Sequence, residues 1–342
     1  MASQSAMGAK TLSTSKRGQL VKEAAGPVCP ACGETSPEAA IDKYGRCELF
    51  GCNECGLQFW EPREMPDARW YEQMYGGRDE KLLPQEPGHK YFLADPLAPH
   101  GGELLDIGCG TGTFLAAARN AGYGVTGIEL DRNAARFAKE RLGLQRVFPL
   151  TILEFAEQHA EERFDVVTFF EVLEHQAAPL GFLQKVKMCL KARGLIALSV
   201  PNRERWLTGP DVLDYPPNHF VRWNTAALGK FLSALGFEVL SIREQPAGLA
   251  HTAQMINMAL RTGMSHYVAA EASTCFQDVM QMTSEQAEAV LRAKPTTRER
   301  AMQILERIKY AACFPLAVAA YPYVRMRGLK GTYLYCLARK LD

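Results

Sequence analysis

The sequence lacks an excess of charge, since 39 lysine and arginine residues stand against 38 aspartate and glutamate residues, a net charge of +1 over 342 residues. It also lacks a dense stripe of basic residues, which argues against nucleic acid as a partner. No signal peptide is recognisable, and the apolar stretch at 310–324 is shorter than the ~20 residues that a membrane-spanning helix needs. These absences predict a globular protein, with the cytoplasm as its expected location.

The composition is otherwise that of a folded chain. Hydrophobic residues make up 47% of it, and its length allows more than one core. Residues 1–26 are rich in Ser, Ala, Lys and Gly with few large apolar side chains, so we expect a disordered tail there.

Four of the ten cysteines form two knuckles of the pattern Cys-x-x-Cys-Gly: Cys29, Cys32, Cys52 and Cys55. Two such knuckles can aim four thiolates at one point and complete a tetrahedral site, for which zinc is the expected occupant. The pattern predicts a zinc ribbon over residues 27–61, stabilised by its metal. A redox dithiol is the alternative, whereas Cys47 has no partner at knuckle spacing and is left out.

Residues 104–114 read Leu-Leu-Asp-Ile-Gly-Cys-Gly-Thr-Gly-Thr-Phe, an apolar strand followed by a glycine turn that enters a helix. Glycines at 108, 110 and 112 let the backbone turn sharply and approach a ligand, while the helix N-terminus offers unpaired N–H groups. The third glycine follows the second by two residues rather than three, which disfavours a dinucleotide. The turn therefore predicts a nucleoside-cofactor site, the alternative being a tight turn without a ligand.

This stretch resembles motif I of the class I S-adenosylmethionine (SAM)-dependent methyltransferases. The resemblance implies that Asp106 and the loop Gly108, Cys109, Gly110 and Gly112 hold the amino-acid end of SAM, with no catalytic role for Cys109. Glu129, in the next strand, matches the acid that accepts both ribose hydroxyls. Further cofactor contacts are expected at four positions: Leu130, Thr151, Phe170 and Tyr75.

Strands and helices alternate along the rest of the chain. Strands are predicted near 103–107, 124–129, 146–149, 164–170, 194–200, 236–243 and 332–339, and helices at 131–142 and 224–235. The fold expected is α/β, a seven-stranded, doubly wound, Rossmann-like methyltransferase sheet with an N-terminal zinc ribbon and a helical insertion. The methyltransferase core is assigned to 101–245 plus 331–342, and a helical linker to 62–100. In that linker Tyr71 and Tyr75 are candidates for a cofactor lid.

The insertion between the sixth and seventh strands covers 246–330. Two capping-box patterns and apolar residues at helical spacing predict helices that lie over the active-site face. The segment 310–330 has two interpretations. A buried cap helix is favoured over a peripheral membrane contact, which an apolar segment with basic flanks also suits.

The catalytic candidates follow the fourth strand in Glu171-Val-Leu-Glu174-His175. If a helical turn starts at Glu171, its side chain shares a face with those of Glu174 and His175. His219 lies in a proline-rich loop that is expected to return over the same edge of the sheet. Two carboxylates and two imidazoles suit Mg²⁺ or Mn²⁺. The alternative is that His175 acts as a general base without a metal.

The segment Glu171–His175, with a later histidine, resembles two groups of enzymes: the ubiquinone-biosynthesis O-methyltransferases and the small-RNA 2′-O-methyltransferases. The zinc knuckles with this core also resemble bacterial methyltransferases of surface-polysaccharide or lipid-linked glycan synthesis. The resemblance implies metal-assisted O-methylation of a sugar, lipid-linked glycan or other polyhydroxylated or phenolic acceptor, with His175, Glu171 and His219 as catalytic residues. An RNA 2′-O-methyltransferase, a metal-independent C- or N-methyltransferase and a non-catalytic SAM-binding protein are the alternatives. Asn202 is a further candidate to face the substrate.

Overall fold

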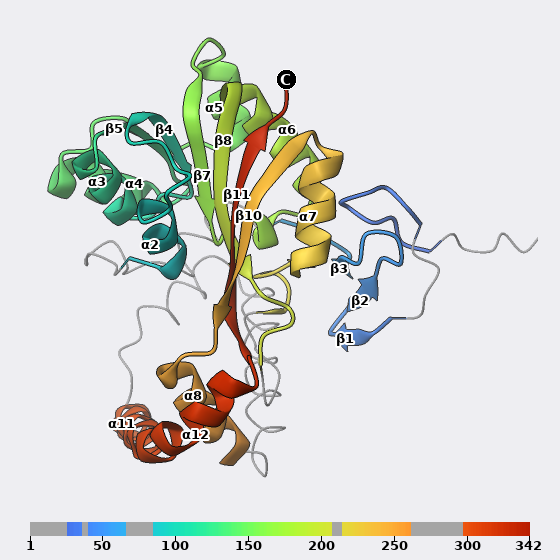
Figure 1. Ribbon diagram of the computed structural model, residues 1–342, viewed down its shortest axis with the longest axis vertical. Coiled ribbons are helices and arrows are strands. Elements are labelled where there is room, and N and C mark those ends of the chain that lie inside the picture. The colour runs from blue at the N-terminus through green and yellow to red at the C-terminus, as the bar shows by residue number, and fades with distance from the viewer. Residues whose placement is uncertain (1–25, 36–39, 66–84, 207–213, 261–296) are drawn as a thin grey trace, which may run out of the picture.

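The central element is a seven-stranded sheet with the strand order β10-β11-β8-β7-β4-β5-β6 (Figure 1). The computed structural model describes residues 26–35, 40–65, 85–206, 214–260 and 297–342. The strands of the sheet are β4 (Gly102–Ile107), β5 (Tyr123–Ile128), β6 (Val147–Phe148), β7 (Phe164–Phe170), β8 (Leu190–Pro201), β10 (Phe237–Pro246) and β11 (Lys330–Lys340). From β8 to β6 neighbouring strands are parallel, whereas β11 is antiparallel to both β8 and β10. The predicted sheet, including the hairpin of its sixth and seventh strands, is confirmed.

Helices cover both faces of the sheet: α2 (Pro87–Leu93), α3 (Thr113–Asn120), α4 (Arg132–Leu142), α5 (Ile152–Gln158), α6 (Pro179–Cys189) and α7 (Thr225–Ala234). Neighbouring strand residues alternate between two separate cores, since Leu104 and Val166 lie in one and Leu105 and Val167 in the other. Alternation with both faces buried is what a doubly wound sheet requires. Asp131 caps α4 as predicted, accepting a hydrogen bond of 2.8 Å from the Asn133 N–H.

A second sheet joins the N-terminal module to the rest of the chain. It has the order β1 (Asp42–Tyr44), β2 (Cys47–Gly51), β3 (Gln58–Glu61) and β9 (Val221–Arg222). Its fourth strand thus comes from the loop after β8, far away in the sequence. The pattern of knuckles predicted the ribbon but gave no sign of this shared strand.

Beyond the end of the large sheet lies a helical lobe (Figure 1). It contains α8 (Leu249–Leu260), α11 (Thr297–Ala312) and α12 (Phe314–Met326), which pack around a small core of Ala253, Cys313 and Ala317. The described part of 246–330 is therefore largely helical. Among the described residues, no helix combines the length and the apolar character needed to cross a bilayer.

The segment 62–100 is described only in part, and α2 is the helix that the structure shows in it. Tyr71 and Tyr75 lie outside the described residues, as do residues 1–25 of the expected tail. The lid and the tail therefore stay predictions.

Candidate active site and metal centres

The glycine turn between β4 and α3 has the backbone that its sequence predicts. Gly108, Gly110 and Gly112 have φ angles of +75°, +53° and +80°, in the left-handed region that favours glycine. A Cβ at Gly112 would lie 2.6 Å from a Leu144 methyl group, whereas one at Gly110 would meet no protein atom within 4 Å. Gly112 thus allows close packing and Gly110 faces open space, an arrangement that fits a ligand held by the turn.

Two acids stand beside this turn at the ends of adjacent parallel strands. Asp106 is 3% exposed and accepts a 2.7 Å hydrogen bond from the Thr168 hydroxyl, and burial raises its pKa to about 8. Glu129 accepts hydrogen bonds from the backbone N–H groups of Gly110, at 2.8 Å, and Asp131, at 2.9 Å. Glu129 therefore fixes the turn, and Asp106 is a buried acid that a cationic group of a ligand would ionise.

The other residues predicted to contact the cofactor differ in burial and in the groups that they could present to it. The Cys109 thiol lies against β5, because a Cβ at Gly127 would lie 2.7 Å from its sulfur, and it donates to the Gly110 carbonyl at 3.9 Å. Thr151 caps α5, accepting from the Glu154 N–H at 3.1 Å. Leu130 is half-buried beside Glu129, and Phe170 is buried against the ring of Phe114 at the end of β7. Cofactor contact at these positions stays a prediction.

Glu171 does not lie where the helical spacing placed it. The helical turn is a 3-10 turn, η1 (Leu173–His175), and it begins after Glu171. Glu171 has a φ of +54°, and its backbone N–H donates to the Ser199 carbonyl at 3.0 Å. Its carboxylate accepts from the Ser199 hydroxyl at 2.7 Å, and burial raises its pKa to about 8. The prediction of Glu171 as a ligand in one cluster with Glu174 and His175 is therefore wrong, because the chain turns sharply between β7 and η1.

The structure does bring Glu174, His175 and His219 together, with candidate ligand atoms all within 4.8 Å of one another. Nε2 of His175 lies 3.8 Å from a carboxylate oxygen of Glu174, and the two imidazole rings are 4.9 Å apart. Glu174 is 1% exposed, and neither of its oxygens has a hydrogen-bond partner among the described residues. A buried carboxylate in this state needs a proton or a cation. Burial, followed by the charge of Glu171, raises its pKa well above the usual value.

Both histidines of this group have a fixed tautomer. Nδ1 of His175 contacts the carbonyl oxygen of Asn218, which can only accept, so Nδ1 carries the hydrogen and Nε2 keeps its lone pair. Nδ1 of His219 lies 3.4 Å from the Asp214 carboxylate, which selects the same tautomer. Burial and the neighbouring His219 lower the pKa of His175 to about 3, so it is neutral at physiological pH. Both rings thus present Nε2 as a candidate ligand atom.

Asp214 is held by two guanidinium groups, from Arg205 at 2.6 Å and from Arg222 at 3.2 Å. Burial opposes ionisation of Asp214, but the hydrogen bond with His219 and these two cations lower its pKa to about 2. Asp214 therefore stays charged and orients His219. Its place in the loop after β8 carried no motif that could have identified it in the sequence.

Asn202 differs from the expectation that it faces a substrate. It is 0% exposed, and its side-chain oxygen accepts from the Glu204 N–H at 2.9 Å. Its backbone forms a bridge with Trp223. Asn202 therefore shapes the turn after β8.

The four knuckle cysteines come together as predicted. The sulfurs of Cys29 and Cys55 are 3.6 Å apart, and those of Cys32 and Cys52 are 3.5 Å apart. Thiolates bound to one zinc ion at about 2.3 Å would have a similar spacing, so the donor set fits zinc. Cys47 is not in this group and lies near the Pro62 carbonyl instead.

The ribbon contacts the Glu174 group through the backbone. In Trp60 the backbone N–H donates to the Phe220 carbonyl at 2.9 Å, and the indole N–H donates to the Asp214 carbonyl at 3.1 Å. The Phe220 N–H in turn donates to the Glu174 carbonyl at 2.9 Å. Trp60 thus links the cysteine module to the loop of His219.

The sheet order, the glycine turn and the acids after β4 and β5 match the pattern predicted for a class I SAM-dependent methyltransferase domain. Residues 80–242 match a family described as a methyltransferase domain. Over 111 residues the chain is 39% identical to a ubiquinone biosynthesis O-methyltransferase of Actinobacillus pleuropneumoniae, covering 30% of this chain and 47% of that protein. Over 114 residues it is 40% identical to the protein of the same name from Cereibacter sphaeroides, covering 32% and 46%. The chain thus spans about half the length of these curated relatives.

Among solved structures, a putative sarcosine dimethylglycine methyltransferase from Galdieria sulphuraria aligns with 80% of this chain and 98% of its own. The sequence identity is 18% and the TM-score 0.45.

Proposed function

We propose that this protein transfers the methyl group of SAM to a hydroxyl oxygen of a small acceptor, with a divalent cation held by Glu174, His175 and His219. The observation that carries the proposal is the buried, unpartnered carboxylate of Glu174 beside two imidazoles with available Nε2 atoms. This donor set suits Mg²⁺ or Mn²⁺. The relatives named for ubiquinone biosynthesis support a phenolic or polyhydroxylated acceptor, and the proposal extends to the hydroxyl groups of a sugar or lipid-linked glycan.

The reaction forms an oxygen–methyl bond and breaks the sulfur–methyl bond of the sulfonium, and the acceptor loses the hydroxyl proton. A divalent cation, when bound, supplies Lewis acidity that makes the hydroxyl easier to deprotonate. Glu171 has its pKa raised to about 8, close to neutrality, so its carboxylate is suited to receive the proton. Ser199 orients that carboxylate through its 2.7 Å hydrogen bond.

A second candidate is metal-independent transfer to oxygen, nitrogen or carbon, with Nε2 of His175 as the base. The hydrogen bond from Nδ1 to Asn218 favours it, because this bond leaves the lone pair of Nε2 available, whereas the lowered pKa of His175 opposes it. The two candidates differ in whether a cation is required.

The test supplies the full chain with methyl-labelled SAM and a demethylated host extract, and then fractionates lipid, glycan, RNA, protein and small molecules. It is repeated with mild chelation, and again with excess Mg²⁺ restored, while the bound zinc is measured in parallel. Label in a lipid, glycan or small-molecule fraction only when Mg²⁺ is present supports the metal-assisted reaction. Transfer that continues under chelation supports His175 as base, and label in RNA overturns the acceptor class.

Substitutions of the proposed cation ligands test whether they are required for methyl transfer. Glu174→Gln and His219→Gln should each lower transfer at least a hundredfold while SAM binding stays within about twofold, because they lie outside the glycine turn. Glu238→Gln, an exposed glutamate paired with Arg339, is the control and should retain full activity. Full activity of both site variants would contradict the proposed cation site.

A further inference from the structure

The helix α12 has two apolar faces, and the described residues of the chain cover only one of them. On one side it buries Ala317 and Val324, and the N-cap residue Cys313 is buried as well, all at most 4% exposed. On its other side four large apolar residues are 55–76% exposed: Leu316, Val318, Tyr323 and Met326. A soluble helix normally places polar residues on its outer face. This helix therefore presents an apolar surface to its surroundings.

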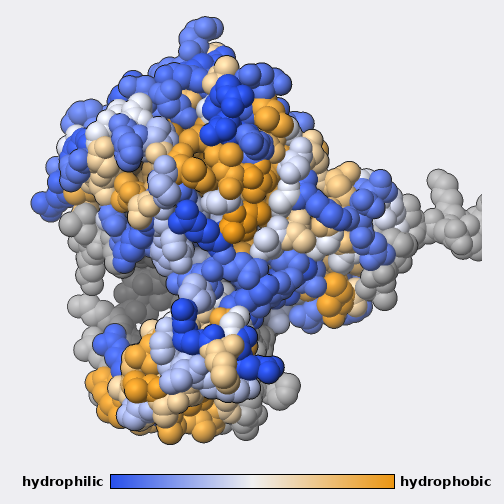
Figure 2. Space-filling model, viewed as in Figure 1, coloured by the Kyte–Doolittle hydropathy of each residue, from blue (hydrophilic) through white to orange (hydrophobic). Residues whose placement is uncertain are grey.

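The preceding helix α11 continues this surface. Ile304, Leu305 and Ile308 recur at helical spacing and are 58%, 44% and 59% exposed. Figure 2 shows apolar residues gathered along the lower rim of the lobe that α8, α11 and α12 form. We define the outer surface as these three residues together with Leu316, Val318, Tyr323 and Met326.

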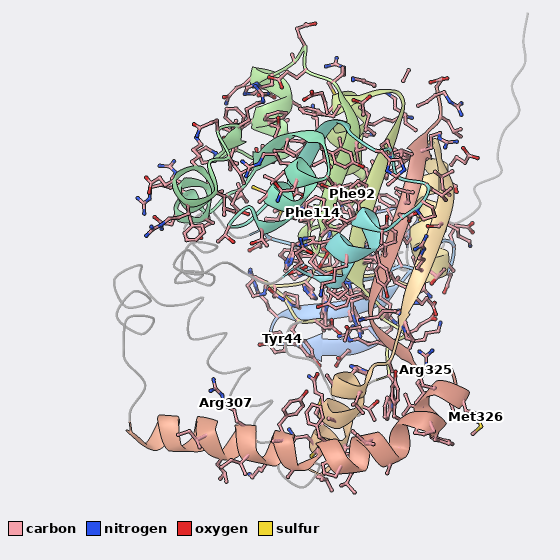
Figure 3. The ribbon with its side chains drawn as sticks, turned by 60° about the vertical axis from the view of Figure 1, so that its left-hand side comes forward. Tyr44, Phe92, Phe114, Arg307, Arg325 and Met326 are labelled. Atoms are coloured by element: carbon pink, nitrogen blue, oxygen red, sulfur yellow. The ribbon has the colours of Figure 1, made fainter. Side chains whose placement is uncertain are left out.

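Cations border the outer surface on both helices. Arg307 and Lys309 lie on either side of the apolar row of α11, and Arg325 and Arg327 on either side of that of α12, given 3.6 residues per turn. Figure 3 shows Met326 pointing away from the protein beside Arg325. No charged residue occurs between Lys309 and Arg325, and no acidic residue occurs from Arg307 to Lys340. From Arg307 onward the segment is thus apolar with cationic borders, and Glu306 is the acidic residue that precedes it on α11.

We propose that the outer surface binds an anionic lipid bilayer, with α11 and α12 lying in the plane of the membrane. Apolar side chains would enter the boundary between headgroups and acyl chains while the arginines and lysine contact lipid phosphates. A second copy of the chain is disfavoured as the occupant, because it would bring identical cations together in a dry interface. The cationic border therefore favours an anionic bilayer over a second copy of the chain.

The proposal goes beyond the proposed reaction, because the outer surface lies on helices outside the sheet. The strands β10 and β11 lead into this lobe from the end of the sheet at which Glu171 and Ser199 lie. Docking would place that end near the bilayer, whatever acceptor the enzyme uses.

The test is sedimentation of the full chain with vesicles of phosphatidylcholine alone and of an equal mixture with phosphatidylglycerol. We expect binding to the mixture, weakened by salt, and much weaker binding to phosphatidylcholine alone. Arg325→Gln with Arg327→Gln should lower binding to the mixture about thirtyfold, at about fivefold per cation. The matched control is Arg136→Gln with Arg141→Gln, two exposed arginines on α4, which should bind as the wild type does.

The apolar contribution is tested with Leu316→Ser and Met326→Ser together, against Met188→Ser, an exposed methionine on α6. The first should lose most binding and the second none, and unchanged thermal unfolding would show that the fold is intact. Absent binding to the anionic vesicles, or equal binding by all variants, overturns the proposal. The proposal is also overturned if the wild-type protein forms a dimer and the protein with Leu316→Ser and Met326→Ser does not, because the outer surface would then bind a second copy of the chain. None of these measurements depends on methyl transfer, so their outcome is independent of whether the proposed reaction is correct.

Discussion

Asp106 is a buried acid whose charge state depends on what occupies the glycine turn. With no cation nearby, burial raises its pKa to about 8, so below pH 8 the protonated form predominates. If the ammonium group of SAM contacts this carboxylate, as the family resemblance implies, binding favours the ionised form and must expel the proton.

We therefore predict that SAM binding releases about one proton at pH 7 and that its affinity rises up to about tenfold per pH unit from pH 6 to 8, then levels off. Calorimetry in buffers of different ionisation enthalpy measures the proton release. Asp106→Asn should abolish the pH dependence and weaken binding. Thr168→Val should move the midpoint to higher pH, because the Thr168 hydrogen bond lowers the pKa of Asp106. Binding without proton release would contradict contact between Asp106 and the ammonium group.

At the same scale, Asp214 is a positioning residue for His219. Its charge is held by Arg205 and Arg222, and it fixes the tautomer that leaves Nε2 of His219 available. Asp214→Asn should lower the affinity for the divalent cation about 10–100-fold, as loss of an outer carboxylate behind a histidine ligand does. Titration of Mg²⁺ or Mn²⁺ against activity measures this as a raised half-saturating concentration, with the SAM dissociation constant unchanged. An unchanged metal requirement in a protein of normal stability would show that His219 needs no such orientation.

At the scale of elements, the ribbon and the loop of His219 contribute strands to one sheet. Residues of β3 pair with β9 directly after His219 and Phe220, so zinc bound at the knuckles would also order the loop. We predict that Cys55→Ser loses zinc, loses hydrogen-exchange protection at residues 219–222 and loses methyl transfer, while SAM still binds.

Cys47→Ser is the matched control for this prediction, since Cys47 lies in the same module but outside the cysteine group. It should keep zinc, protection and activity. Protection at 219–222 that survives zinc loss would show that the loop is ordered without the ribbon.

The sequence predicted well those elements that depend on residues close together in the chain. The strands of the sheet, the glycine turn, the Asp131 cap and the four knuckle cysteines each follow from residues near one another in the chain. Glu171 was misplaced because helical spacing was extended through a residue that adopts φ +54°, a conformation without a sequence signature for glutamate. The β3–β9 pairing joins residues some 160 positions apart, and local sequence patterns cannot predict such a pairing. The role of Trp60 depends on the same pairing and could not be predicted either.

At the scale of the whole molecule, the helical lobe has a core of its own. Ala253, Cys313 and Ala317 form a cluster separate from the two cores on the faces of the sheet. The lobe is joined to the sheet by β10 and β11, whose pairing continues as far as Pro246 and Lys330. Local unfolding of such a unit can leave the rest of a protein intact.

We predict that Ala317→Asp, which buries an unpaired carboxylate, unfolds the lobe but leaves the sheet folded. Calorimetry should show a weakened or lost transition for the lobe and a main transition that SAM still raises, because a ligand stabilises the unit that binds it. The SAM dissociation constant should change by less than about twofold, since the substitution lies outside the glycine turn. Ala319→Asp places the same charge on the exposed side of α12, and both transitions should persist in that control. Loss of SAM binding in the Ala317→Asp protein alone would mean that the lobe and the cofactor turn fold as one cooperative unit.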